Sequence, residues 1–244
     1  MKKILKISVT TLVTGIVIAF AGFYIWSQIT FKASEDMSEY VDMDNIQQEE
    51  NWLVFEPENH ATTGIILYPG AKVEPQAYSY YAEQLANAGY SVYIPKVNFN
   101  FAIFDVNQAE LIMQQFTNIK NWIVGGHSLG GVAAASFAYD HMDKVDGLLF
   151  LASYPSDSND FSETKLPILS LYAENDGLTT VEKIDETKRL LSSKATLYEI
   201  KGGNHAQFGM YGEQKGDGES TISVKEQQEI MADQTSKWLN DILQ

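Results

Sequence analysis

The chain has 244 residues, of which 45% are hydrophobic and 20% charged, and its formal net charge is −15. This composition is that of a globular protein, and the acidic balance excludes the basic surface that a nucleic-acid-binding protein needs. The chain contains no cysteine, which excludes disulfides, a thiol nucleophile and thiolate metal sites, and Arg189 is its only arginine, so a bidentate phosphate clamp is not expected.

The first segment combines a basic start with a long apolar run. Three lysines within the first six residues precede residues 7–26, which carry no charge and would span about 30 Å as a helix. Tyr24 and Trp26 stand at the far end, where interfacial aromatic residues belong, and an acidic stretch follows. This pattern predicts a single-pass anchor in the cell membrane through residues 7–26, with a cytoplasmic N-terminus and an extracytoplasmic domain.

A cleaved signal peptide is the alternative reading of the same segment. Ala19-Phe20-Ala21 fits the small-residue pattern of a cleavage site, and cleavage after Ala21 would give a secreted protein. The apolar run continues past this point to Trp26, which favours the uncleaved anchor. We therefore expect an anchor over residues 1–26, an acidic linker over 27–50 and a single domain over 51–244.

Beyond the predicted linker, short apolar runs alternate with amphipathic stretches. Several of these runs are continuous, as in strands that are covered on both faces. The runs predict strands at residues 52–55, 64–68, 91–94, 122–125, 147–152, 168–172 and 196–200.

Helix signals lie between these runs. Pro75 is placed to open a helix that Gly89 ends, because proline suits the first helical position and glycine the end. Thr179 and Ser223 are each followed three residues later by glutamate, the spacing of a capping box, before residues 181–191 and before the last helix. Alternating strands and helices predict an α/β fold with a mostly parallel central sheet and helices on both faces.

The run Gly-Gly-His-Ser-Leu-Gly-Gly at residues 125–131 is the main chemical motif. A Gly-x-Ser-x-Gly match alone is a weak signal. Here it follows a predicted strand and opens a helix of small residues, which is typical of a nucleophile elbow, where a strained turn exposes the serine hydroxyl. Gly126 and Gly130 would leave room for that turn. We therefore predict that Ser128 is the nucleophile.

A serine nucleophile needs a histidine base that a carboxylate orients. His205 follows the last predicted strand, whereas His60 precedes the nucleophile, His127 adjoins it and His141 ends the next helix. We therefore predict that His205 is the base, which gives the chain order serine, acid, histidine.

The acid is expected after the next-to-last strand, and Asp176 is the preferred candidate, with Glu174 as a nearby competitor. Two backbone amides should form the oxyanion hole. The Leu129 amide is one, because it follows the nucleophile. Ala71, in the loop after the strand at 64–68, is the expected second donor.

The region from about residue 52 to the C-terminus resembles the α/β-hydrolase superfamily. Within it, the chain is similar to the small cap-less bacterial "α/β hydrolase family" group, related to the dienelactone-hydrolase-like branch. The resemblance implies Ser128, Asp176 and His205 as a catalytic triad. The loop at 68–73 departs from the His-Gly pair of many lipases, and the nucleophile is serine where dienelactone hydrolases use cysteine, so their substrate does not carry over. The motifs that carry the resemblance are residues 68–73, 125–131, 175–178 and 203–209.

The sequence also bears on access to the site. Residues 154–166 are short and polar, which predicts an open site without a helical lid. The glycine-rich loop 206–221 starts at the predicted base and either shapes the site or is an ordinary surface loop. A set of aromatic residues either lines an acyl pocket or packs in the core: Phe99, Phe101, Phe104, Phe208 and Tyr211.

Together these features predict a membrane-anchored serine hydrolase that cleaves a carboxylic ester through an acyl-enzyme. The substrate would be a small-molecule or surface-linked acyl ester, and we expect no cofactor, no metal ion and no nucleic-acid partner. Two alternatives remain open: an acyltransferase that uses the same triad, and an inactive anchored binding protein. No feature of the sequence specifies an oligomeric state.

Overall fold

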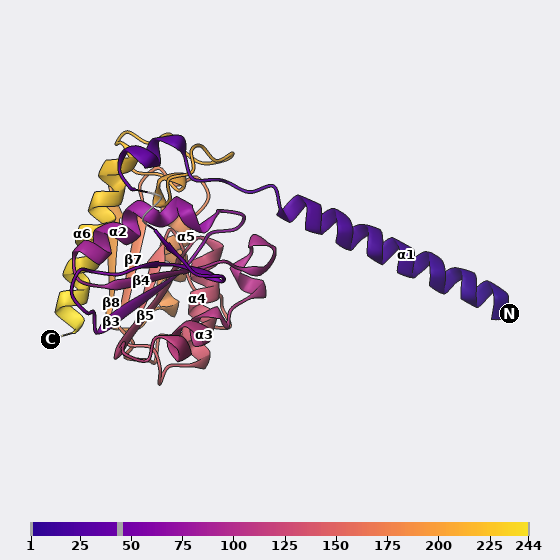
Figure 1. The fold of residues 1–244 in the computed structure, drawn as a ribbon, viewed down its shortest axis with the longest axis horizontal. Helices are drawn as coiled ribbons and strands as arrows, with labels where there is room; N and C mark the ends of the chain where they lie inside the picture. Colours follow the sequence, from indigo (N-terminus) through magenta and orange to yellow (C-terminus); the bar gives the residue numbers. More distant parts are fainter. Residues whose placement is uncertain (1, 43–45, 244) are drawn as a thin grey trace.

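A computed structural model describes residues 2–42 and 46–243 of the chain, without the side chains of residues 2–10 and 36 (Figure 1). The three N-terminal lysine side chains of the predicted anchor therefore lie outside the described part.

A mixed sheet of eight strands forms the centre of the described domain, in the order β1-β2-β4-β3-β5-β6-β7-β8. Neighbouring strands from β4 to β8 are parallel, whereas β2 is antiparallel to both β1 and β4. The strands are β1 Gln47–Gln48, β2 Trp52–Phe55, β3 Thr63–Tyr68, β4 Ser91–Pro95, β5 Asn121–His127, β6 Gly147–Leu151, β7 Ile168–Ala173 and β8 Ala195–Ile200.

Helices cover both faces of this sheet. Figure 1 shows α2 and α6 together on one side and α3 and α4 on the other. The helices are α1 Lys2–Ser27, α2 Ser79–Asn87, α3 Gln108–Gln115, α4 Leu129–Asp140, α5 Val181–Thr187 and α6 Val224–Ile242. Short 3-10 turns complete the described chain: η1 Glu35–Glu39, η3 Pro75–Tyr78, η4 Asn98–Asn100, η5 Ala102–Phe104, η6 Lys188–Leu190 and η7 Ala206–Phe208.

Each face of the sheet has its own hydrophobic core. Leu85 of α2 and Trp238 of α6 belong to one cluster, with Ile65 of β3. Ile112 of α3 and Phe137 of α4 belong to the other. The mostly parallel α/β sheet predicted from the alternating pattern is thereby confirmed, and the antiparallel β2 makes it mixed.

Helix α1 projects away from the domain (Figure 1). Within the described residues, no helix combines the length and the apolar character needed to cross a membrane. The large side chains of α1 from Leu12 to Trp26 are mostly exposed. The helix meets the domain at its C-terminal end, so the segment that follows it is the physical link to the sheet.

That link, residues 28–42, lies against the domain over much of its length. Phe31 forms a parallel bridge with Val73, and Ser34 N–H donates to the Met210 carbonyl at 2.7 Å. Met37 and Val41 are buried beside Tyr80 and Met210. Residues 28–42 of the acidic segment expected as a linker are therefore packed on the domain. Between β6 and β7, the chain forms turns without a helix.

Candidate active site

The predicted nucleophile stands at a sharp turn between β5 and α4. Ser128 has φ 52° and ψ −122°, a conformation that costs a non-glycine residue about 1–3 kcal/mol. Two contacts hold it: Ser128 N–H donates to the Leu151 carbonyl at 2.9 Å, and Ser153 Oγ donates to the Ser128 carbonyl at 2.6 Å. The last residue of the neighbouring strand β6, and Ser153 two residues after it, thus maintain the strained turn.

The two glycines that flank the serine are required by close backbone contacts. A Cβ at Gly126 would lie 2.4 Å from the Gly130 carbonyl carbon. A Cβ at Gly130 would lie 2.3 Å from the Tyr68 carbonyl oxygen, at the end of β3. Only glycine fits either position, and the contact at Gly130 places the start of α4 directly against the loop that follows β3.

The predicted base and acid are in contact at the same edge of the sheet, after β8 and β7. His205 Nδ1 lies 2.8 Å from Asp176 Oδ2, and both side chains are almost completely buried. The other carboxylate oxygen accepts the amides of Leu178, at 2.8 Å, and Thr179, at 2.6 Å. Asp176 is therefore fixed by its own turn, with one oxygen directed to the imidazole.

Glu174, the competing carboxylate, has different partners. Its Oε2 accepts the Gly202 amide at 2.9 Å, and the side chain is exposed beside Lys201. The Gly202 amide, with the Lys201 ammonium nearby, lowers the pKa of Glu174. The carboxylate that contacts His205 is that of Asp176.

The turn that carries the serine lies beside the loop that carries the histidine. The His127 ring, next to Ser128 in the chain, is centred 4.6 Å from the His205 ring. Among the described residues, no hydrogen bond joins Ser128 Oγ to His205. Catalytic hydrogen bonds are often long in unliganded enzymes and shorten when substrate binds.

Asp217 is a site residue that the sequence analysis missed. Its Oδ1 accepts the amides of Gly177, at 3.1 Å, and His205, at 3.2 Å, and its Oδ2 accepts the Ala206 amide at 2.8 Å. One carboxylate thus ties the acid loop to the base loop. The available signal was its place between Gly216 and Gly218 in the long loop after His205.

The loop after β3 leaves one amide available near the nucleophile. The Gly70 amide donates to Tyr78 Oη at 2.8 Å, and the Lys72 amide donates to the Asn100 carbonyl at 2.7 Å. Between them, the Ala71 amide has no hydrogen-bond partner among the described residues. Leu129 opens α4, so its amide also lacks an intrahelical partner.

His127 and Tyr78 form a buried pair behind this loop. Tyr78 Oη lies 2.9 Å from His127 Nδ1 while it accepts the Gly70 amide. The tyrosine hydroxyl can donate to Nδ1 or accept from it, so either tautomer of a neutral His127 satisfies this contact. Burial, together with the neighbouring His205, holds the pKa of His127 well below its usual value, and burial raises the pKa of Tyr78.

The five aromatic residues that the sequence leaves open between an acyl pocket and the core separate into two groups. Phe208 and Tyr211 are buried and lie beside His127, with ring centroids 5.9 Å and 6.2 Å away. Phe99, Phe101 and Phe104 instead lie at the surface, where their rings contact α1.

The other polar groups have separate positions. His60 is exposed in a loop, and His141 Nδ1 lies 3.0 Å from the Phe137 carbonyl. In the described part of the chain, no three histidine or carboxylate side chains form a group that could hold a metal ion.

Solved structures with similar folds come from several sources. A predicted CIB-like hydrolase from Thermoplasma acidophilum superposes with a TM-score of 0.58 and 16% identity, covering 78% of this chain and 98% of that one. The α/β hydrolase MGS-MChE2, from a sediment metagenome of the Mar Chica lagoon in Morocco, gives 0.58 and 19%, covering 81% and 99%. Est1E from Butyrivibrio proteoclasticus gives 0.60 and 12%, covering 80% and 98%.

No curated protein matches the chain in sequence. Residues 64–229, more than half of the chain, match the alpha/beta hydrolase family. This segment contains the strained serine turn, the aspartate–histidine contact and the loop after β3. The chain therefore belongs to the alpha/beta hydrolase family.

Proposed function

We propose that the chain is a serine ester hydrolase with Ser128 as nucleophile, His205 as base and Asp176 as its orienting carboxylate. The observation that carries this proposal is the buried His205–Asp176 contact, at the same sheet edge as the strained Ser128 turn. A serine hydroxyl becomes a useful nucleophile when a histidine held by a third group removes its proton.

The chemistry follows from these positions. His205 Nε2 takes the proton of Ser128 Oγ as the oxygen attacks the ester carbonyl, and Asp176 stabilises the imidazolium. The amides of Leu129 and Ala71 donate to the developing oxyanion. Return of the proton to the leaving alcohol gives the acyl-enzyme, which water, activated by the same histidine, then hydrolyses.

A phosphonate label and ester turnover test this mechanism together. Wild-type protein should be labelled at Ser128 by a fluorophosphonate and should hydrolyse p-nitrophenyl esters, with acyl chains of increasing length defining its preference. Ser128→Ala should lose about 10³-fold or more in kcat. Ser136→Ala, on the same helix α4, is the matched control and should retain activity.

Two results would change the proposal. Full ester hydrolysis by Ser128→Ala would refute the mechanism, and failure to label Ser128 would favour a binding protein. Addition of an alcohol to the assay distinguishes hydrolysis from transfer, because an acyltransferase would form the new ester in place of the free acid.

Membrane attachment through α1 is part of the same proposal. Residues 7–26 carry no charge, and Leu12, Ile16, Ile18 and Ile25 are each exposed by 60% or more of their surface. Large apolar side chains exposed around a helix favour contact with lipid. We further propose that the domain lies on the extracytoplasmic side, because the three lysines precede the apolar run.

Cell fractionation tests the attachment. The full chain should stay with membranes in alkaline carbonate and be released by detergent. Protease added to intact spheroplasts should digest the domain if it lies outside. Release by carbonate, or a mature chain that starts after Ala21, would contradict the anchor.

A further inference from the structure

The end of α1 and the loop after β4 form one aromatic cluster, here called the aromatic collar, which consists of Phe20, Phe23, Trp26, Phe99, Phe101 and Phe104. Phe23 is its centre, with ring centroids 5.8 Å from Phe99, 6.2 Å from Phe101 and 6.1 Å from Phe104. Phe20 contacts Phe99 at 6.0 Å, and Trp26 stacks on Phe101 at 5.6 Å.

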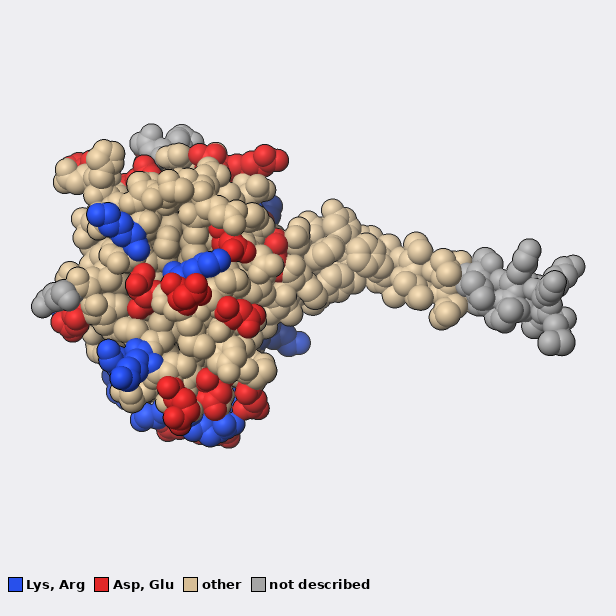
Figure 2. All heavy atoms as spheres, turned by 90° about the horizontal axis from the view of Figure 1, so that it is seen from below, with Lys and Arg blue, Asp and Glu red and all other residues tan. Residues whose placement is uncertain are grey.

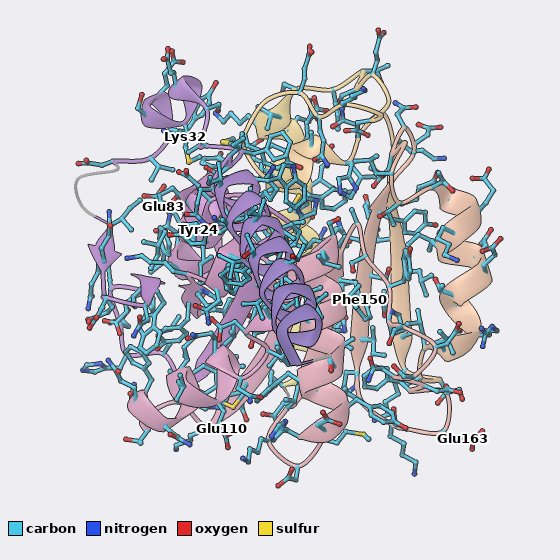
Figure 3. All side chains as sticks on the ribbon, turned by 90° about the vertical axis from the view of Figure 1, so that its right-hand side faces the viewer. Tyr24, Lys32, Glu83, Glu110, Phe150 and Glu163 are labelled. Carbon is cyan, nitrogen blue, oxygen red and sulfur yellow. The ribbon has the colours of Figure 1, made fainter. Side chains whose placement is uncertain are left out.

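The collar joins the apolar surface of α1 to the domain without interruption. Phe104 and its neighbour Ile103 are exposed by 54% and 41%, and Ile25 of α1 by 66%. Figure 2 shows uncharged surface at the point where the helix meets the domain, with charged side chains of both signs around it. Figure 3 looks along the helix toward this face, with Tyr24 and Glu83 labelled at the left and Glu110 and Glu163 toward the lower rim.

The collar is also attached to the loop that carries the proposed oxyanion donor. Lys72 adjoins Ala71, its amide donates to the Asn100 carbonyl, and its ammonium lies 4.2 Å from the centre of the Trp26 ring. Asn100 Nδ2 in turn donates to the Ser27 carbonyl at 3.0 Å. Turn η5 of the collar packs against α4, the helix that Ser128 opens.

The backbone of the collar loop is strained to hold this arrangement. Phe99 and Asn100 have φ of 57° and 59°, and Lys72 has φ of 61°. Such a conformation is uncommon for residues other than glycine. The loop after β4 and the loop after β3 are therefore both strained where they touch. Such strain indicates that the surrounding fold maintains their contact.

The depth of the collar in a bilayer would decide which part of the lipid lies beside Lys72 and the Ala71 amide. Tryptophan and tyrosine rings prefer the headgroup region, and lysine extends its ammonium toward water from that level. With Tyr24 and Trp26 at that level, Lys72 and the adjoining Ala71 amide lie there too. The ester carbonyls of a membrane amphiphile occupy this same interfacial layer.

The geometry points to a bilayer as the occupant of the collar and to an ester of a membrane-resident amphiphile as the substrate. The collar would rest on the lipid surface and hold the Ser128 turn beside the interfacial layer, so that an acyl chain enters along apolar side chains. The substrate class rests on the proposed ester hydrolase function, whereas the contact between the collar and the lipid does not.

A charge introduced into the exposed collar tests the substrate class. The full chain is reconstituted in phosphatidylcholine–phosphatidylglycerol vesicles that contain a fluorogenic diacyl lipid ester, and p-nitrophenyl acetate is the water-soluble probe. Ile103→Asp should lower turnover of the vesicle ester roughly tenfold, because it opposes apolar contact with lipid, and should leave turnover of the soluble ester unchanged. Met142→Asp is the matched control, since Met142 is also 41% exposed and follows the far end of α4.

A depth measurement tests the contact without any activity. In a chain that carries Trp26→Phe, the fluorescence gained with Phe104→Trp should be quenched by brominated lipids in the vesicles, and the fluorescence gained with Met142→Trp should not. Equal quenching at the two positions, or none at Phe104→Trp, would overturn the contact between the collar and the lipid.

The activity outcomes are also distinct. Equal loss on both esters in Ile103→Asp, or no loss on the vesicle ester, would overturn the inference. A wild-type protein that hydrolyses only the soluble ester would overturn the substrate class and leave the proposed function intact. A wild-type protein that hydrolyses neither ester would refute the proposed function itself.

Discussion

Tyr78 Oη lies 2.9 Å from His127 Nδ1 and also accepts the Gly70 amide, so one buried hydroxyl connects the strand before the nucleophile to the loop after β3. Neither residue belongs to the proposed triad. A Cβ at Gly70 would lie 2.8 Å from His127 Nδ1, which shows how closely the loop rests on the ring. The position of the Ala71 amide therefore depends on side chains behind it.

Tyr78→Phe should lower kcat with little change in KM. The Gly70 amide would lose its acceptor, and a small displacement of the neighbouring Ala71 amide should cost roughly 10- to 100-fold. Tyr81→Phe is the matched control, because Tyr81 is equally buried and its hydroxyl bonds Thr235 at 2.7 Å, away from the site. Equal losses in both variants would indicate a general packing effect.

The buried neutral His127 should make the protein less stable in mild acid. Its pKa in the folded chain lies well below the ordinary value of 6.5. Between the two values the unfolded chain binds a proton that the folded chain does not, so the free energy of unfolding falls as the pH drops below about 6.5. The slope approaches about 1.4 kcal/mol per pH unit for one such group.

Chemical unfolding across this pH range measures that slope. His127→Gln should flatten it, whereas His60→Gln should retain it, because His60 is exposed. An unchanged slope in His127→Gln would assign the acid sensitivity to another group.

The contact between Asp176 and His205 predicts a large kinetic effect. Asp176→Asn should lower kcat by about 10⁴-fold, the loss seen when the corresponding aspartate of a serine protease is replaced. Glu174→Gln, two residues away on the exposed side of the turn, should stay near wild type. Steady-state kinetics on a p-nitrophenyl ester measures both losses in kcat. A larger loss in Glu174→Gln than in Asp176→Asn would indicate that Glu174 is the carboxylate that orients His205.

Asp217 should matter for both stability and rate. Asp217→Ala leaves the amides of Gly177, His205 and Ala206 without their acceptor, which should cost about 1–3 kcal/mol of unfolding free energy and lower kcat. Glu219→Ala, exposed in the same loop, is the control. Wild-type kcat in Asp217→Ala would show that the two loops keep their positions without this carboxylate.

Much of the fold was predictable from local pattern. Several of the parallel strands are continuous apolar runs, whereas β8 alternates between exposed and partly buried residues. Ser223 caps the last helix by accepting the Glu226 amide, as its spacing indicated. In the other predicted box the capping oxygen belongs to Thr180 rather than Thr179, since Thr180 Oγ1 accepts the Lys183 amide. Two adjacent threonines are nearly equivalent candidates for the N-cap of α5. Asp176 accepts the Thr179 amide, and this tertiary contact leaves Thr180 as the cap.

Other parts of the site depend on contacts between distant segments. Asp217 lies in an irregular loop, and its role exists only because the loops after β7 and β8 meet there. Likewise, Phe99 and Phe101 gave no signal that distinguished pocket from core, because their partners are on α1, far earlier in the chain. Local sequence could identify Ser128, Asp176 and His205 as candidates, but not what fixes them.

The seating of residues 28–34 on the loop after β3 limits where a soluble form of this protein can begin. Phe31 N–H donates to the Lys72 carbonyl at 2.7 Å, and its own carbonyl accepts the Glu74 amide at 2.9 Å. A chain that starts after residue 34 would lose both bonds and leave an uncovered edge beside the Ala71 amide, the proposed oxyanion donor. A soluble version that starts at Ser27 or Gln28 removes the apolar helix α1 and keeps residues 28–34 in place on the loop after β3. That version is the better starting point for crystallisation.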